Sequence, residues 1–181
     1  MTRAAVLAPG YGGGATQPIL GALVKALAGY GIEGYPIAFR TRGGPPSRNY
    51  ADELDDLRTA RDQLRATHRK VALVGRSFGG RMCAFLAERE PPDALAIVGH
   101  PIAPPDRPRP RDAAALAAVR CRTLVVQGAS DELGPVAVLE RIATTNPLID
   151  LVVIPDAGHE LGRHEHEAVE HVARWLDAAL R

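Results

Sequence analysis

Short apolar runs alternate with longer amphipathic segments along the chain. The apolar runs, which we predict to be strands, cover residues 4–8, 35–39, 71–75, 94–98, 123–127 and 151–154. They are continuously apolar, as is typical of strands buried on both faces of a parallel sheet. Helices are predicted at residues 17–28, 51–67, 78–90, 135–144 and 165–180. This alternation predicts an α/β fold, a doubly wound, mostly parallel six-stranded sheet with helices on both faces.

Two segments interrupt the alternation. Residues 40–49 and 99–112 are rich in proline, glycine and arginine, and we predict loops there. The density of proline in the second segment argues against any helix within it. This segment is also too short to be a lid domain. We therefore expect residues 1–181 to form a single domain whose ligand site is rather open.

Composition excludes several classes of function. The 22 basic residues nearly balance the 21 acidic ones, so no charge surplus indicates a nucleic-acid partner. Two cysteines, Cys83 and Cys121, make neither a disulfide framework nor a metal pair. Residues 4–8 are too short for a signal sequence, and no run approaches the roughly 18 apolar residues of a membrane span. We expect a soluble cytoplasmic protein with no membrane partner.

The first candidate for chemistry lies between a predicted strand and a predicted helix. Residues 75–79 have the sequence Gly-Arg-Ser-Phe-Gly, which fits G-x-S-x-G. In a nucleophile elbow the serine occupies a strained strand-to-helix turn, and the flanking glycines let the strand and the helix pass closely. The alternative is a glycine-lined turn without chemistry. The elbow interpretation makes Ser77 a nucleophile.

An acid and a histidine follow later strands in the order that such a serine requires. Asp131 follows the fifth predicted strand and His159 follows the sixth, in the order Ser…Asp/Glu…His. Glu132 and Asp156 are alternative acids. We favour Asp131, because it comes first after its strand, whereas Asp156 is only three residues before His159.

The glycine-rich loop after the first strand is a candidate oxyanion hole. Such a hole needs the N–H of the residue after the nucleophile, here Phe78, and one N–H from the first loop. Tyr11 is the predicted second donor. Gly10, beside it, and His100, which follows the fourth strand, are candidates for lining the pocket.

Cofactor and metal sites fit the sequence poorly. The first loop matches G-x-G-x-x-G/A only loosely, and Arg40 and Arg42 stand after the second strand where a dinucleotide site needs an acid. The histidine-rich segment near the end contains no H-E-x-x-H. We predict neither a cofactor nor a metal.

Four segments together resemble the α/β-hydrolases: "GRSFGGR", "GHPIAPP", "LVVQGASDELG" and "IPDAGHEL". The resemblance is to a compact, lidless subgroup near the dienelactone hydrolases, which includes testis-expressed protein 30 and a hydrolase-like subunit of the non-specific-lethal complex. It implies a minimal α/β-hydrolase fold with Ser77 as nucleophile, Asp131 as acid and His159 as base. Two departures stand out. Pro9-Gly10 replaces the common His-Gly, and Ser77 replaces the cysteine of dienelactone hydrolases proper, which argues against their substrate.

The sequence thus predicts a serine esterase or thioesterase that cleaves a small-molecule ester through an acyl-enzyme. The alternative is a non-catalytic α/β-hydrolase-like scaffold, for which the Pro/Arg-rich residues 104–111 offer an exposed surface to a protein partner. The substrate, the oligomeric state and the role of Arg76 do not follow from the sequence.

Overall fold

Parallel strands form the centre of the protein. The computed structural model describes residues 2–181. Its strands are β1 (Arg3–Ala8), β2 (Ile32–Pro36), β3 (Lys70–Arg76), β4 (Ala94–Val98), β5 (Thr123–Gly128) and β6 (Ile149–Ile154). They lie in the order β2-β1-β3-β4-β5-β6, and all neighbouring pairs are parallel. The predicted doubly wound six-stranded sheet is confirmed. All its carboxyl ends lie at one edge, where ligands bind in open α/β sheets.

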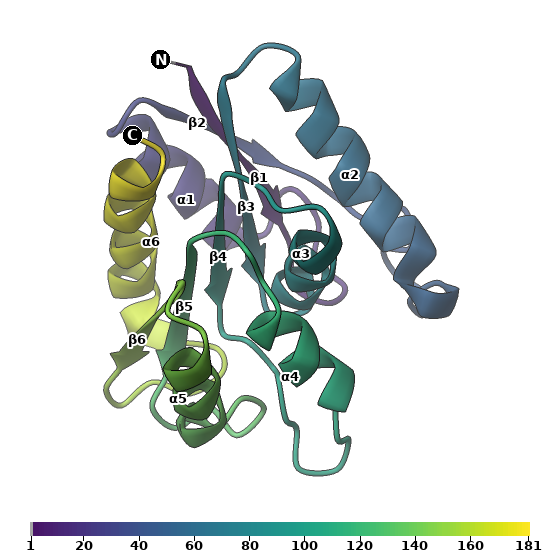
Figure 1. Ribbon diagram of the computed structural model, residues 1–181, viewed down its shortest axis with the longest axis vertical. Coiled ribbons are helices and arrows are strands. Elements are labelled where there is room, and N and C mark those ends of the chain that lie inside the picture. Colours follow the sequence, from purple (N-terminus) through teal and green to yellow (C-terminus); the bar gives the residue numbers. More distant parts are fainter. Residues whose placement is uncertain (1) are drawn as a thin grey trace.

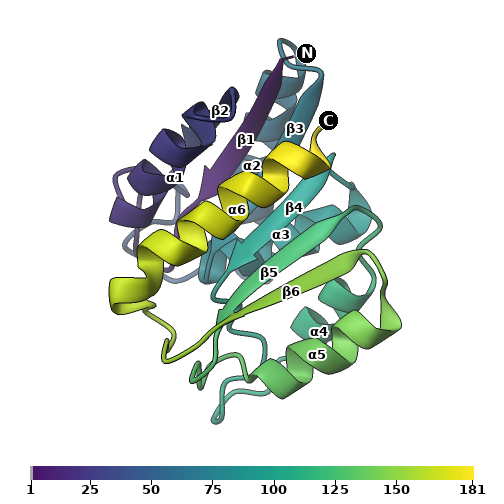
Figure 2. The ribbon, with the colours of Figure 1, turned by 90° about the vertical axis from the view of Figure 1, so that its left-hand side faces the viewer.

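Helices cover both faces of this sheet (Figures 1 and 2). They are α1 (Pro18–Ala28), α2 (Ala51–Arg65), α3 (Phe78–Arg89), α4 (Pro110–Ala117), α5 (Val136–Thr145) and α6 (Glu165–Ala179). Helices α1 and α6 pack side by side on one face, and α2, α3, α4 and α5 cover the other. Apart from β2 and α4, element ends lie within two residues of their predicted positions.

The prediction was wrong for the second strand, expected at residues 35–39. The observed strand, β2, is an edge strand in which Glu33 and Tyr35 are exposed. An edge strand needs fewer apolar residues than a central one, so its pattern is weaker. The residues that follow include the buried Phe39, which packs into the core from a loop rather than from a strand.

The prediction also missed α4, whose first residues lie in the segment expected to exclude a helix. Pro110 is the first residue of this helix. The first N–H groups of a helix have no partner within it, so proline loses nothing at this position and begins helices well. Beyond it the alanine-rich stretch up to Ala117 continues the helix, and Leu116 is buried.

Each face of the sheet has its own apolar core. On one face Leu20 and Leu23 of α1 meet Val172 and Leu176 of α6. On the other, Phe85 of α3 is the largest fully buried side chain. Burying a side chain of this size contributes about 1.5–3 kcal/mol. These two cores hold the strand ends, and therefore the loops at the carboxyl edge, in fixed relative positions.

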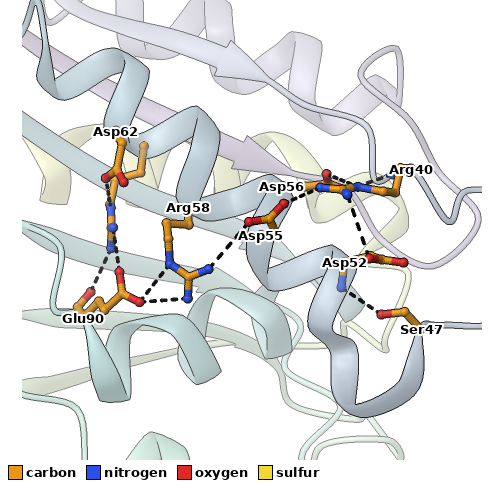
Figure 3. Close-up of polar contacts among 9 residues, drawn as sticks. Arg40, Ser47, Asp52, Asp55, Asp56, Arg58, Asp62 and Glu90 are labelled. Atoms are coloured by element: carbon orange, nitrogen blue, oxygen red, sulfur yellow. Dashed lines mark hydrogen bonds and ion pairs between the residues drawn. The ribbon is translucent and has the colours of Figure 1, made fainter.

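An ion-pair network ties α2 to the end of α3 (Figure 3). Arg58 Nη2 and Arg61 Nη2 lie 2.8 and 2.7 Å from the two carboxylate oxygens of Glu90. Hydrogen bonds from Arg58 and Arg61 lower the pKa of Glu90 to about 2. Glu90 therefore joins the two helices while it is ionised.

Replacing Glu90 by Gln tests this link. The depressed pKa means that its contribution is complete above pH 4.5 and is lost as the pH falls towards 2. Because the carboxylate is partly exposed and screened by solvent, we expect a loss of about 1 kcal/mol in the free energy of unfolding at pH 7. Urea unfolding at pH 7 and at successively lower pH measures this difference in the free energy of unfolding, with Glu88→Gln as the matched control. A difference between wild type and variant that is the same at every pH would contradict the assignment.

Candidate active site

Ser77 lies on a sharp turn between β3 and α3. Its backbone has φ 49° and ψ −110°, a region that side-chain-bearing residues rarely adopt. The flanking glycines permit the close approach of strand and helix. A Cβ on Gly79 would lie 2.5 Å from the carbonyl oxygen of Ala8 and 2.6 Å from that of Pro9. Strain of this kind is common at functional sites.

Substituting this glycine has a sharp expected result. Gly79→Ala places a methyl group against two backbone carbonyls that cannot rotate away, so α3 must move off the end of β1. We expect a loss of more than about 3 kcal/mol in unfolding free energy, or no soluble folded protein. Thermal unfolding followed by circular dichroism measures it.

Gly21→Ala is the matched control for this substitution. Gly21 is exposed within α1, and nothing lies within 4 Å of its added Cβ. Alanine is the better helix former, so this variant should gain about 1 kcal/mol. Equal melting temperatures for the two variants would contradict the close approach at the elbow.

A chain of hydrogen bonds runs from Ser77 to the sixth-strand loop and on to the fifth. Ser77 Oγ lies 2.8 Å from His159 Nε2, and His159 Nδ1 lies 2.8 Å from Asp131 Oδ2. Because a carboxylate only accepts, Nδ1 carries the imidazole proton and Nε2 is left to accept from the hydroxyl. The structure thus brings these three predicted residues together, although they come from three different loops.

Asp131 is the acid that reaches the histidine, and its side chain is fully buried. Its Oδ1 accepts hydrogen bonds from the backbone N–H of Leu133 at 2.9 Å and of Gly134 at 3.3 Å. The alternative acids lie elsewhere. Glu132 is exposed, and Asp156, also exposed, has a positive φ of 55° in the loop before the histidine.

Gln127, the buried penultimate residue of β5, positions the carboxylate of Asp131 by a hydrogen bond. Its Nε2 donates to Asp131 Oδ2 at 2.7 Å and to the carbonyl of Gly134 at 2.8 Å, while its Oε1 accepts from the N–H of His100. Sequence reasoning missed this residue. The available signal was a lone amide at the end of an otherwise apolar strand, where a buried polar group needs partners.

Arg76, next to the serine, holds the histidine loop. Its guanidinium is buried and donates from Nη2 to the carbonyl oxygen of His159 at 2.6 Å and from Nη1 to that of Val98 at 3.4 Å. Nη1 also lies 3.5 Å from His159 Nε2. Burial lowers the pKa of Arg76, and the Glu160 carboxylate opposes that shift. An arginine in the elbow therefore fixes the imidazole relative to the serine.

The loop after β1 turns its backbone beside the elbow. The carbonyl of Gly10 accepts from the N–H of Gly13 at 3.0 Å, which closes a β-turn with Tyr11 and Gly12 at its centre. The N–H of Gly10 is taken by Gln17 Oε1 at 2.8 Å. Within residues 2–181, neither the N–H of Tyr11 nor that of Phe78 has a hydrogen-bond acceptor. Both are thus free to bind an oxyanion.

Ser77 opens into a cavity of about 350 Å³. Aromatic side chains form part of its wall, and cationic ones form another part: Tyr11, Tyr50, Phe78, Arg81, Arg107 and Arg109. His100 and Gly10 are not among the residues that line this cavity, and that they line a substrate pocket stays a prediction. A volume of this size accommodates a small molecule.

The sequence of residues 1–181 matches the family described as "Alpha/beta hydrolase domain" along its whole length. The chain belongs to this α/β-hydrolase family. No curated protein matches the chain. The narrower likeness to testis-expressed protein 30 and to the non-specific-lethal complex subunit stays a prediction.

Solved structures of other α/β-hydrolases superpose over most of the chain. An alpha-beta serine hydrolase homologue from Coxiella burnetii has 22% identity over 97% of this chain and 86% of its own, with a TM-score of 0.82. A dienelactone hydrolase from Anabaena variabilis has 24% identity, coverage of 99% and 88%, and a TM-score of 0.80. A thermophilic esterase from Thermogutta terrifontis has 21% identity, coverage of 99% and 91%, and a TM-score of 0.79. At these identities the likeness establishes the fold.

Two further features of this α/β-hydrolase are its metal-ligating side chains and the length and apolarity of its helices. Within residues 2–181, no group of three or more metal-ligating side chains gathers. None of the helices in the same described range is both long and apolar enough to span a bilayer. The cytoplasmic location expected from the sequence stays a prediction.

His100 of this hydrolase is fully buried, and among residues 2–181 neither of its ring nitrogens has a hydrogen-bond partner. Burial lowers its pKa to about 4, while the charges of Asp112, Arg81, Arg109 and Asp131 act on it in opposing directions. The ring is therefore neutral at pH 7.

This buried ring makes the protein sensitive to acid. The unfolded chain binds the proton of His100 more readily than the folded one, so stability is complete above pH 6.5 and falls as the pH drops towards 4. We expect His100→Leu to remove about 3 kcal/mol of this pH-dependent loss. Urea unfolding between pH 7 and pH 4 measures the loss, with the exposed His166→Leu as control. Identical pH slopes for His100→Leu and wild type would contradict the prediction.

Proposed function

We propose that this α/β-hydrolase is a serine esterase or thioesterase that cleaves small carboxylic ester or thioester bonds through Ser77, His159 and Asp131. The observation that carries this proposal is the continuous hydrogen-bond chain from the Ser77 hydroxyl through the imidazole to a buried carboxylate. Its serine lies on a strained turn at the edge of a cavity. Such a chain activates a hydroxyl that is otherwise a weak nucleophile.

In the acylation step, Ser77 Oγ attacks the carbonyl carbon of the ester while His159 Nε2 takes the hydroxyl proton. The tetrahedral intermediate collapses, the bond to the leaving oxygen or sulfur breaks, and His159 returns the proton to that atom. Asp131 stabilises the imidazolium formed in between and holds the tautomer. Water then attacks the acyl-serine with the same base, which releases the carboxylic acid and regenerates the Ser77 hydroxyl.

The N–H groups of Phe78 and Tyr11 stabilise the oxyanion in both steps. Phe78 is the first residue of α3, so its N–H lies at the positive end of the helix dipole. Tyr11 has its N–H free of the turn that Gly10 and Gly13 close. One donor of this kind contributes about 3 kcal/mol to the transition state.

The test is inactivation of the wild-type protein by a fluorophosphonate, followed by turnover of p-nitrophenyl butyrate. We expect stoichiometric inactivation in step with the loss of turnover. An acyl-chain series should favour short chains, because the cavity is small. A wild-type protein that neither hydrolyses the ester nor reacts with the probe would refute the proposal and favour the non-catalytic scaffold.

A further inference from the structure

Three arginines line the cavity that contains Ser77, and among its described lining residues none is acidic. Arg81 comes from α3, whereas Arg107 and Arg109 come from the connection between β4 and α4. Figure 1 shows this connection looping out beyond the carboxyl edge of the sheet. Positive charge is therefore concentrated on one wall of a cavity in a protein whose overall charge is nearly balanced.

The three arginines differ in how many hydrogen bonds their guanidinium groups make to the rest of the protein. Arg81 is buried and donates from Nε and Nη2 to Asp112, and its Nη2 also bonds the hydroxyl of Tyr50 at 3.0 Å. Arg109 donates only Nη1, to the carbonyl of Pro101 at 2.8 Å. The side chain of Arg107 is exposed and takes part in no hydrogen bond or ion pair within residues 2–181. The cavity thus contains guanidinium donors that no protein acceptor uses.

Within residues 2–181, Asp112 is the carboxylate that forms an ion pair with this cluster, and Arg81 occupies both of its oxygens. The neighbouring His100 is neutral at pH 7 and adds no charge to the cluster. Burial and, to a lesser extent, the nearby charge of Arg81 lower the pKa of Arg109, while Asp112 opposes this shift. In the described part of the chain, Arg107 and Arg109 therefore remain without an ion-pair partner.

The arginines also border a second hollow, of about 260 Å³, that adjoins the first. Arg81, Arg107, Arg109 and Tyr50 line both spaces. Tyr50 reaches this position from a left-handed backbone conformation with φ 58°, which costs free energy and is held by the surrounding contacts. Its ring stacks on Phe85 with the centroids 5.6 Å apart. Tyr50 and Arg81, which share a hydrogen bond, therefore form a packed part of this wall, beside which the exposed side chain of Arg107 lies.

We infer that the substrate carries an anionic group, a carboxylate or a phosphate, which Arg107 and Arg109 bind while Ser77 attacks the ester or thioester carbonyl. This inference rests on the proposed function of the site and specifies its substrate class. Guanidinium groups bind both kinds of anion through paired hydrogen bonds, and these bonds are stronger in a partly enclosed cavity than in water. The aromatic side chains of Tyr11 and Phe78 contact the uncharged part of the substrate, close to the serine.

The test compares two p-nitrophenyl esters of equal acyl length, the adipate monoester, which ends in a carboxylate, and the adipamate, which ends in a neutral amide. We expect wild type to hydrolyse the charged ester with a kcat/KM about tenfold higher. Arg107→Gln with Arg109→Gln should bring the ratio near one, whereas Arg174→Gln, on the opposite face of the sheet, should leave it unchanged. Added salt should reduce the wild-type ratio. An acyl chain of equal length that ends in a phosphate distinguishes the two kinds of anion.

Calorimetric titration of adipate and of inorganic phosphate into the same proteins separates this inference from the proposed function. Hydrolysis of both esters at equal rates, with no anion binding, overturns the inference and leaves the esterase standing. Anion binding that the double variant loses, in a protein that hydrolyses neither ester, supports the anion site and overturns the esterase. Circular dichroism checks that the double variant is folded.

Discussion

Ser77→Ala is expected to lower kcat for p-nitrophenyl butyrate by at least about 10⁴-fold. The substitution removes only the hydroxyl that His159 Nε2 contacts at 2.8 Å, and leaves the imidazole, the buried carboxylate and the oxyanion donors in place. Without the nucleophile no acyl-enzyme forms, and water must attack the bound ester directly. The remaining rate is that of water attacking a bound ester whose carbonyl the oxyanion donors still stabilise. Steady-state kinetics with a chromogenic ester measures the difference.

Ser130→Ala is the matched control for this variant. Ser130 is exposed beside the acid, and within residues 2–181 its hydroxyl makes no hydrogen bond. We expect its kinetics to equal those of wild type. Comparable losses in both serine variants would show that the reaction does not pass through Ser77.

Asp131→Asn is expected to lower kcat by about 10³–10⁴-fold with little change in fold. The N–H groups of Leu133 and Gly134 are fixed by the backbone, whereas Gln127, which donates to Oδ2, is a side chain that can move, so we expect the oxygen of the new amide to face the two N–H groups. Its NH₂ group then faces His159 Nδ1 in place of Oδ2. Nδ1 must then become an acceptor, so the imidazole proton moves to Nε2. In that tautomer Nε2 can no longer accept the hydroxyl proton of Ser77.

Glu132→Gln separates a general effect of lost charge from the loss of this particular acceptor. Glu132 is adjacent in sequence, but its side chain is exposed. It should retain wild-type kcat. A larger loss for Glu132→Gln than for Asp131→Asn would make Glu132 the acid and contradict the assignment.

The central strands and the sheet order were predictable because a strand buried on both faces is a continuous apolar run. The same rule fails at the sheet edge. Strand β2 exposes Glu33 and Tyr35, so its pattern is weaker than that of the loop that follows, where Phe39 packs into the core. Helix α4 was missed because proline excludes a helix interior but favours a first turn, and its position within a helix depends on the chain around it.

The three residues of the hydrogen-bond chain were predictable because each lies in the turn or loop that follows a strand, and parallel strands bring their carboxyl ends to one edge. The roles of Gln127 and Arg76 were missed, because they depend on which side chains meet across neighbouring loops. His100 follows a strand like the others, but its ring turns inward and is fully buried. Position after a strand fixes where the backbone lies, whereas the direction of the side chain depends on packing.

The most direct test of the esterase proposal is rapid acid quenching of wild-type protein during turnover of p-nitrophenyl butyrate, followed by peptide mass mapping. The proposal predicts one butyryl group on the peptide that contains Ser77, and its loss when the ester is exhausted. In the Asp131→Asn variant the same adduct should form more slowly. Steady turnover with Ser77 unmodified at every time point would contradict the account.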